Sequence, residues 1–288
     1  MNKKKLVLDS GTIVITYLIG AYLIYRKLAL GISKWDPLVC SAIFLALLAL
    51  FLLFFSSNFR KFQREKNDLH KNYSVRLNKA YEGTIKALMS ALDCRDHGTW
   101  DHSLRVVGYA TAIAEKMGIA PEERQKIALA GFLHDIGKIG VPDQILLKKT
   151  KLLPNEWEVI KRHPELGYEI IKQVDFLGNA ADIILLHHEH YDGSGYPFGL
   201  KGEKIPLTAR IFAVADALDA MTSDRPSRSA RLMEEALHEV SSLSGTQFCP
   251  QCVKALEALG IENLHRIEQH VKKQETFNFL PQDLVRCS

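Results

Sequence analysis

Cysteine is scarce in this sequence: the chain holds five cysteines in 288 residues. They lie too far apart for a disulfide framework, so we expect reduced thiols in a cytosolic domain. The one short spacing is Cys249-Pro-Gln-Cys252. A single such spacing is a weak signal for a redox pair or half a metal site, and two ordinary thiols at the start of a helix are the simpler interpretation. No second pair is present to complete a tetrahedral metal site.

Charge is missing from one long run, residues Pro37–Phe55. A stretch of about 20 apolar residues spans the hydrocarbon core of a membrane, so this run predicts a transmembrane helix. Leu6–Tyr25 predicts a second one, although Asp9 weakens it and a cleaved signal peptide is the alternative. The net charge of +4 comes largely from basic residues beside these runs. It therefore indicates a membrane surface and no nucleic-acid polymer.

The basic flanks of these two runs also predict the topology. Lys3–Lys5 precede the first run and four basic residues within Arg60–Lys66 follow the second. Basic residues are enriched on the cytoplasmic side, so we expect both chain ends in the cytoplasm and a two-span membrane anchor over residues 1–55.

The segment after the anchor, Ser56–Met89, is polar and has no proline. Its apolar residues recur every three or four positions, as in one face of a helix. They are Leu69, Tyr73, Leu77, Tyr81, Ile85 and Leu88. Two interpretations remain open: this connecting helix (56–83) pairs with its copy in a homodimer, or it lies against its own domain.

Strand alternation is missing from Thr84 onward, and no internal repeat occurs, so we expect an all-α domain over residues 84–260 and a tail over 261–288. Proline at the first helical position and glycine at helix ends support the boundaries. The expected helices are Leu77–Leu92, Trp100–Met117, Pro121–Ile136, Pro154–His163, Pro164–Val174, Gly178–His190, Leu207–Thr222, Ala230–Leu243 and Pro250–Leu259. The segment Tyr191–Pro206 holds four glycines and two prolines and predicts a long structured loop.

Histidine and aspartate are concentrated on or beside these helices. His134 and Asp135 are adjacent, and Lys138 follows within one helical turn. The further members of the set are His102, His163, His187, His188 and Asp216. For any one histidine, a hydrogen-bonded core residue is the simpler interpretation. That interpretation accounts poorly for all seven histidines and aspartates together. Mixed imidazole and carboxylate ligands suit iron or manganese, with zinc possible.

These residues can be divided between two metal ions. One takes His102, His134, Asp135 and Asp216; the other takes Asp135, His163, His187 and His188. Asp135 then bridges the two ions, and a hydroxide fills the shared position. Two divalent ions, two carboxylates and one hydroxide leave a net positive charge, which favours a phosphate substrate.

The chain from about Thr84 to Leu259 resembles the HD-GYP domain, a subgroup of the HD metal-dependent phosphohydrolases. The resemblance rests on HDIGKIGVPD (His134–Asp143), HHEHYDGSGYP (His187–Pro197), GLKGEKIP (Gly199–Pro206), ARIFAVADALDAMTSDRP (Ala209–Pro226) and GTQF (Gly245–Phe248), with His102-Ser103 and His163-Pro164-Glu165. It implies an all-α, HD-type helical bundle with a GYP extension. It also implies hydrolysis of the bacterial messenger cyclic di-GMP to the linear dinucleotide pGpG or to GMP.

The resemblance assigns roles to individual residues. The family's metal ligands fall on the seven residues above, and its lysine falls on Lys138, whose ammonium suits the scissile phosphate. Tyr196 of the GYP loop would stack on guanine or bond a phosphate; simple loop packing is the alternative. Arg225 and Arg228 match basic residues that hold the phosphate or guanine.

The sequence departs from the family at three informative places. Members with a third metal carry a glutamate four residues before the first ligand histidine, where this chain has Gly98, so we expect two metals, Fe or Mn. Ser227 stands where a tyrosine is common and Cys249 where an aspartate is usual. We therefore expect a cyclic di-GMP phosphodiesterase in the bacterial inner membrane, with its catalytic domain in the cytoplasm. The alternatives are a nucleotide- or partner-binding receptor with little turnover and a hydrolase of another nucleotide.

Overall fold

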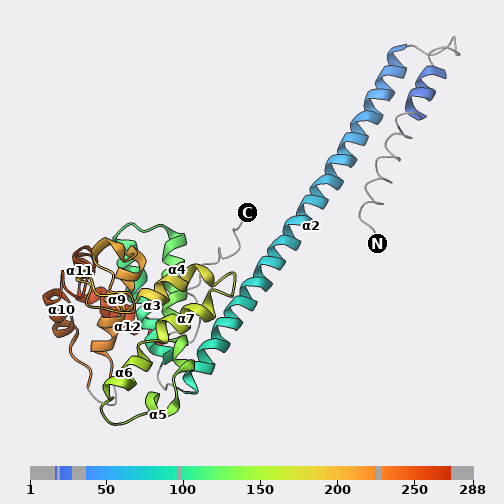
Figure 1. The fold of residues 1–288 in the computed structure, drawn as a ribbon. Coiled ribbons are helices and arrows are strands. Elements are labelled where there is room, and N and C mark those ends of the chain that lie inside the picture. Colours follow the sequence, from blue (N-terminus) through green and yellow to red (C-terminus); the bar gives the residue numbers. More distant parts are fainter. Residues whose placement is uncertain (1–16, 18–19, 28–36, 96–98, 225–228, 274–288) are drawn as a thin grey trace. The chain divides into compact units, whose positions relative to one another are not determined.

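The computed structural model describes residues 17, 20–27, 37–95, 99–224 and 229–273 of the chain (Figure 1). The chain divides into two compact units, Met1–Val75 and Arg76–Ser288. In the first unit, residues 20–27 are helical and precede the long helix α2 (Pro37–Asp93). The rings of Tyr17 and Phe51 stack there with centroids 6.3 Å apart.

Among the described residues, none buries the apolar part of α2. One helix among the described residues, Phe44–Asp93, is long and apolar enough to cross a membrane, judged by length and composition alone. Leu53 and Phe54 are 63% and 69% exposed. The expected span Pro37–Phe55 falls inside α2, whereas most of the expected span Leu6–Tyr25 lies outside the described residues.

Helix α2 continues without a break through the connecting segment to Asp93. Leu69 and Tyr73, on the predicted apolar stripe, are largely exposed. Further along the stripe, Tyr81 stacks on Phe176 with ring centroids 4.0 Å apart, and Ile85 is fully buried. The end of the stripe therefore packs on its own domain, and pairing of the earlier part with a second chain stays a prediction.

The second unit is all-α in its described residues, as expected from the sequence; an isolated bridge between Ser244 and Phe248 is its one β-type pairing there. Its longer helices are α3 (Thr99–Lys116), α4 (Pro121–Leu133), α7 (His163–Ile171), α9 (Leu207–Thr222), α10 (Met233–Ser242), α11 (Pro250–Glu257) and α12 (Ile261–Lys273). Short helices η1 (Ile136–Gly140), α5 (Asp143–Leu146), α6 (Pro154–Ile160), η2 (Gly178–Ala180), α8 (Ala181–Leu186) and η3 (Gly202–Lys204) connect them.

Helix α3 lies at the centre of this unit, against α4, α9 and α12. The buried side chains of α3, including Val106, Val107 and Ile113, meet those of α4 and α9 in one core. Burial of each such aliphatic side chain stabilises the fold by about 1.5–3 kcal/mol. This core fixes the helix ends at which the histidines and aspartates lie.

Several expected boundaries differ from the structure: α8 ends at Leu186 instead of His190, for example, and α10 begins at Met233 instead of Ala230. Two further differences bear on the site and on the extent of the domain. Helix α4 ends at Leu133 instead of Ile136, because the chain tightens into η1 directly after His134 and Asp135. Helix α12 begins at Ile261, where the sequence predicts a tail that is helix-like only at its start, and its Leu264 and Val271 are buried in the common core. The expected domain end at residue 260 therefore falls before a helix that packs into the same domain.

Candidate metal centre

The seven predicted metal-ligand residues come together in the second unit, mostly at helix ends. His134 follows α4 directly and Asp135 precedes η1. His163 is the first residue of α7, and His187 follows α8 and precedes His188. His102 and Asp216 lie within α3 and α9. Helix ends let several chain segments approach one point, so residues distant in sequence meet there.

Three of the histidines make the same type of contact with the backbone, each with a different carbonyl oxygen. The Nδ1 atoms of His134, His163 and His187 lie 3.1, 2.8 and 2.6 Å from the carbonyl oxygens of Gly131, Ile160 and Ile184. A carbonyl oxygen only accepts hydrogen bonds, so each Nδ1 carries the proton. Each ring therefore presents the lone pair of Nε2 to the centre, which is the form that binds a metal.

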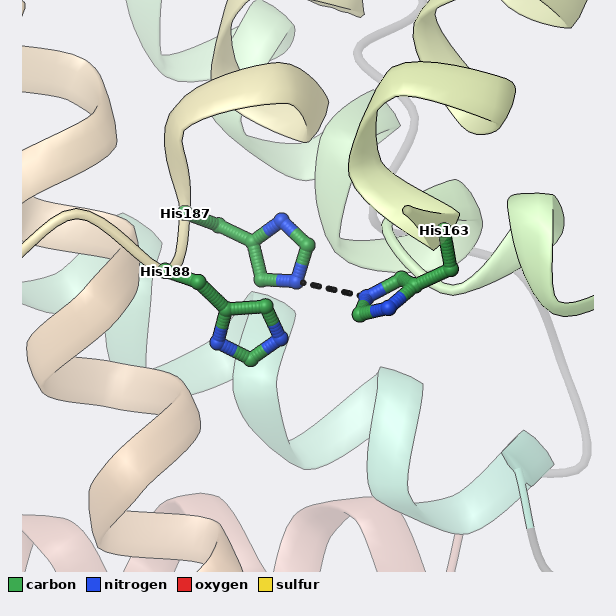
Figure 2. Close-up of side chains that lie close together, drawn as sticks. All are labelled: His163, His187 and His188. Atoms are coloured by element: carbon green, nitrogen blue, oxygen red, sulfur yellow. Dashed lines mark hydrogen bonds between the residues drawn. The ribbon is translucent and has the colours of Figure 1, made fainter. Parts of the chain in front are cut away.

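These Nε2 atoms face one another in pairs. The Nε2 atoms of His163 and His187 are 3.4 Å apart, a contact drawn as a dashed line in Figure 2. The Nε2 atoms of His102 and His134 are also 3.4 Å apart. Two lone pairs at this separation repel unless a proton or a cation lies between the rings.

Burial makes a proton the weaker explanation at the His163–His187 pair. Burial lowers the pKa of His163, and it lowers the pKa of His187 well below the usual value, with the neighbouring histidines adding to the effect. Burial likewise lowers the pKa of His188 to about 4. All three rings are therefore neutral near pH 7, as metal ligation requires.

Asp135 lies between the two groups of histidines. Its Oδ2 is 3.4 Å from Nε2 of His134, and its Oδ1 is 3.5 Å from Nε2 of His163. Burial opposes ionisation of Asp135, but Lys138, His134 and His163 outweigh it and hold the pKa of this carboxyl well below its usual value. The carboxylate is thus ionised and directs one oxygen to each group.

The centre consequently has two chemically different halves. The acidic half is His102, His134, Asp135 and Asp216; Oδ1 of Asp216 is 3.4 Å from Nε2 of His102 and 3.9 Å from Nε2 of His134. The imidazole half is His163, His187 and His188 (Figure 2), and Oδ1 of Asp135 lies 3.5 Å from Nε2 of His163. Ligand atoms of His163, His187 and His188 all lie within 4.8 Å of one another, as do those of His102, His134 and Asp135.

Lys138 supplies the nearest ammonium. Its Nζ is 2.8 Å from Oδ2 of Asp135, and its side chain is 23% exposed. The lysine therefore reaches both the bridging position and the solvent side of the centre. An ammonium is no metal ligand, so this position suits contact with an anion beside the ions.

Two glycines allow the chain to close around the centre. A Cβ on Gly137 would lie 1.9 Å from the carbonyl oxygen of His163, so only glycine lets η1 approach the start of α7. A Cβ on Gly195 would lie 2.2 Å from the backbone nitrogen of His190. Glycine at 195 therefore lets the loop fold back onto the segment that carries His187 and His188.

The folded-back loop brings Tyr196 to the centre. Its ring stacks on His188 with centroids 4.7 Å apart, and the Nζ of Lys161 lies 5.9 Å from the Tyr196 centroid. Burial and the charges of Asp135 and Asp216 raise the pKa of Tyr196, so its hydroxyl stays protonated. One ring face packs on a histidine; guanine stacking on the tyrosine stays a prediction.

Sequence reasoning missed the groups that orient these residues. Fully buried Asp219 accepts hydrogen bonds from Nδ1 of His102 at 2.7 Å and from Nε of Arg105 at 2.5 Å. Burial acts to raise the pKa of Asp219, but these two partners outweigh it and lower the pKa. The signal was spacing: Asp219 and Arg105 lie three residues after Asp216 and His102, one helical turn away.

Buried Glu189 holds the loop in a similar way. Its carboxylate accepts hydrogen bonds from the backbone N–H groups of Phe198 and Leu200 at 2.8 and 2.9 Å. Its place directly after His188 is the only hint that the sequence provides. Arg225, Arg228 and Gly98 lie outside the described residues.

The residues present fit a pair of divalent cations. Neutral imidazoles with inward lone pairs, and two carboxylates beside them, form the donor set that iron and manganese accept. Cations at the positions where these atoms converge would offset the repulsion between the facing lone pairs and the negative charge of the carboxylate between them.

Comparisons with known proteins agree with this arrangement. The model of the family described as HD domain matches residues 86–251. A cyclic di-GMP phosphodiesterase response regulator, RpfG, from Xanthomonas campestris is 47% identical over 175 residues, which are 60% of this chain and 46% of that protein. A 3'3'-cGAMP-specific phosphodiesterase 2 from Vibrio cholerae is 35% identical over 187 residues, or 64% and 36% of the two chains. The chain spans less than half the length of these two relatives.

A solved structure shows the same fold. It is described as a cyclic GMP-AMP specific phosphodiesterase of V. cholerae, and it superposes with a TM-score of 0.53 and 22% sequence identity. The match covers 70% of this chain and 54% of that chain.

Proposed function

This chain belongs to the HD domain family, and on that premise we propose that it is a metal-dependent phosphodiesterase that hydrolyses cyclic di-GMP. The observation that carries the proposal is the ionised Asp135 between two sets of inward-facing imidazoles, with the Lys138 ammonium beside it. The names of the curated relatives support this substrate class.

Each residue of the centre has a task in this proposal. Two bound divalent ions would supply Lewis acidity and an activated water for in-line attack on phosphorus. Asp135 places one carboxylate oxygen at each half and so fixes the position of the two halves relative to each other. Lys138 binds a nonbridging phosphate oxygen and stabilises the negative charge that develops there in the transition state. Electrostatic stabilisation of this kind is usually the largest single contribution to catalysis.

The rest of the nucleotide needs further contacts. Tyr196 keeps its hydroxyl proton and so donates a hydrogen bond to a phosphate oxygen or a base. Arg225 and Arg228, which follow α9, complete the set with planar forks suited to phosphate and guanine. The products are pGpG, GMP or both.

A second candidate substrate is 3'3'-cGAMP, because a relative that is 35% identical carries that specificity in its name. Both dinucleotides have the same phosphodiester chemistry and differ in one base. A receptor role with little turnover would instead show binding without product.

The direct test is incubation of the full-length chain in detergent micelles with Mn²⁺ or Fe²⁺ and each dinucleotide under reducing conditions. Products are separated by chromatography. We expect cyclic di-GMP to be cleaved and a metal chelator to stop the reaction. Faster cleavage of 3'3'-cGAMP would shift the substrate assignment, and binding of both without cleavage would make the chain a receptor.

The anchor is part of the proposal. Two transmembrane helices over about 6–25 and 37–55 would hold the chain in the bacterial inner membrane, with the connecting helix as a homodimer contact and the domain from residue 84 in the cytoplasm. A reporter fused after Ser288 should behave as cytoplasmic. A periplasmic signal would contradict this topology.

A further inference from the structure

The cysteine pair Cys249-Pro-Gln-Cys252 stands outside the metal centre and has its own geometry. Cys249 directly precedes α11, Pro250 is the first residue of that helix, and Cys252 lies in its first turn. Both thiols are buried, at 2% and 0% exposure. Among the described residues, no group of three or more metal-ligand side chains includes either cysteine.

The Cys249 sulfur is held as an acceptor. Nη1 of Arg210 donates to it at 3.2 Å, and the same guanidinium donates from Nε to the carbonyl oxygen of Ile205 at 2.9 Å. The sulfur makes no capping hydrogen bond to the first N–H groups of α11, although the amides of Gln251 and Cys252 lie near enough to favour its thiolate. A thiol that only fills core volume needs no such set of donors.

The two sulfurs differ in the way that a redox pair requires. Burial acts to raise the pKa of Cys249, but the backbone N–H groups and Arg210 outweigh it and lower the pKa. Burial and the adjacent Cys249 sulfur raise the pKa of Cys252. One sulfur is therefore suited to attack as a thiolate, and the other, three residues later at the start of the same helix, is suited to close the bond.

The pair also lies beside the loop of the metal centre. The turn before Cys249 bonds to that loop through two carbonyl oxygens: Gln247 accepts the N–H of Tyr191 at 3.1 Å, and Thr246 accepts the N–H of Asp192 at 2.8 Å. Tyr191 and Asp192 lie three and four residues after His188. Cys249 thus lies two residues after Gln247, which contacts this loop directly.

We propose that Cys249 and Cys252 form a reversible dithiol–disulfide site that a peroxide oxidises, and that closure of the disulfide loosens the contact of the 246–247 turn with Tyr191 and Asp192. A peroxide is small enough for a thiol of low exposure. Reversible oxidation of this kind is the usual form that cytosolic disulfides take.

The chemistry balances in two steps. The Cys249 thiolate attacks one peroxide oxygen; the O–O bond breaks, and a sulfenic acid and a hydroxide form. Cys252 then attacks the Cys249 sulfur; its proton and the sulfenic hydroxyl leave as water, and the S–S bond forms. The dithiol loses two hydrogens and two electrons, and hydrogen peroxide becomes two water molecules.

The first test treats the reduced full-length chain in detergent micelles with hydrogen peroxide and maps its peptides by mass spectrometry. The peptide with both cysteines should lose two hydrogens and regain them with dithiothreitol. Cys252→Ser should abolish this change, whereas Cys94→Ser, at an exposed thiol elsewhere, should leave it intact. Arg210→Lys should slow it roughly three- to tenfold. Survival of both thiols in the parent while Cys94 is oxidised would overturn the proposal.

The second test measures amide hydrogen exchange in the same reduced and oxidised samples. Exchange at Tyr191 and Asp192 should rise several-fold on oxidation and return to the starting rate on reduction. The Cys252→Ser chain should show no rise. Unchanged exchange in a parent chain that does form the disulfide would overturn the coupling to the loop. Neither test depends on catalytic turnover, so its outcome is independent of the proposed phosphodiesterase activity.

Discussion

The acidic half and the imidazole half of the centre are built from similar histidines but differ in charge. The acidic half has Asp216 as its own carboxylate, shares Asp135, and is backed by Asp219 and Arg105. The imidazole half has no carboxylate of its own: Oδ1 of Asp135 lies 3.5 Å from Nε2 of His163, and His188 feels the charges of Asp216 and Asp135. The acidic half should therefore hold its cation more tightly, and the imidazole half should depend on the bridge.

The largest expected effect comes from removal of the bridge. Asp135→Ala leaves the imidazole half with neutral ligands only, and both halves lose the shared carboxylate. We expect loss of both cations and no measurable hydrolysis. Asp182→Ala, at an exposed carboxylate of α8, is the control and should behave like the parent. Elemental analysis and a product assay on both variants check this; hydrolysis by Asp135→Ala would remove the carboxylate from the mechanism.

The next effect separates charge stabilisation from metal binding. Lys138→Ala should keep both cations, because an ammonium does not ligate them, but lower the single-turnover rate by about 100- to 1000-fold. Nucleotide binding should weaken less than the rate if Lys138 acts mainly on the transition state. Lys126→Ala, whose ammonium pairs with Glu123 on α4, serves as the control. A parent-like rate in Lys138→Ala would contradict the role given to this lysine.

A smaller effect should be confined to the acidic half. Asp219→Asn weakens the acceptor that orients His102, and loss of such a partner typically lowers metal affinity about 10- to 100-fold. A two-step metal titration should show the tighter step weakened and the other nearly unchanged. Equal loss at both steps would mean that the halves are not independent. Arg105→Lys, which keeps a positive charge beside Asp219, should have a smaller effect.

The smallest expected effect is the opposite pH dependence of the halves without metal. In the imidazole half, burial lowers the histidine pKa values, so below about pH 6.5 the unfolded chain binds protons that the folded chain does not. The free energy of unfolding therefore decreases as the pH is lowered below about 6.5. For His188 this decrease continues to about pH 4 and is on the order of 1 kcal/mol per pH unit. Burial acts to lower the pKa of His134, but Asp135 and Asp216 outweigh it and raise the pKa. Its contribution is present below about pH 6.5 and is lost as the pH rises.

His188→Gln tests this difference. The variant should show a shallower loss of stability between pH 6.5 and 5 than the parent. Chelator-treated chains are unfolded in denaturant while the fluorescence of Trp100 and Trp157 in the second unit is followed. A slope equal to that of the parent would show that His188 is not held neutral by burial.

The sequence predicts which histidines and aspartates meet at the centre, because each of them stands in a short motif next to a helical pattern; their role as metal ligands stays a prediction. His134 and Asp135 end an apolar run, and His187 and His188 open a glycine-rich loop. The division into two halves is also predictable from residue types. The contacts of Nδ1 with carbonyl oxygens are not, because they depend on where each helix ends, and α4 ends three residues before the expected boundary.

The supporting residues are harder to predict for a different reason. Asp219 has the spacing of a helix neighbour of Asp216, but its role depends on α3 and α9 lying side by side, which places it against His102 and Arg105. Helix α12 is amphipathic and polar overall, so its sequence resembles an exposed tail. Only packing against α3 shows that its apolar stripe belongs to the core.

The most direct test of a two-cation centre bridged by Asp135 is a Mn²⁺ titration of the full-length chain, followed by electron paramagnetic resonance. We predict two Mn²⁺ ions per chain at saturation with the signal of a magnetically coupled pair, and no coupled pair in Asp135→Ala. Saturation at one ion, at three ions, or at two uncoupled ions in the parent chain would contradict the centre described above.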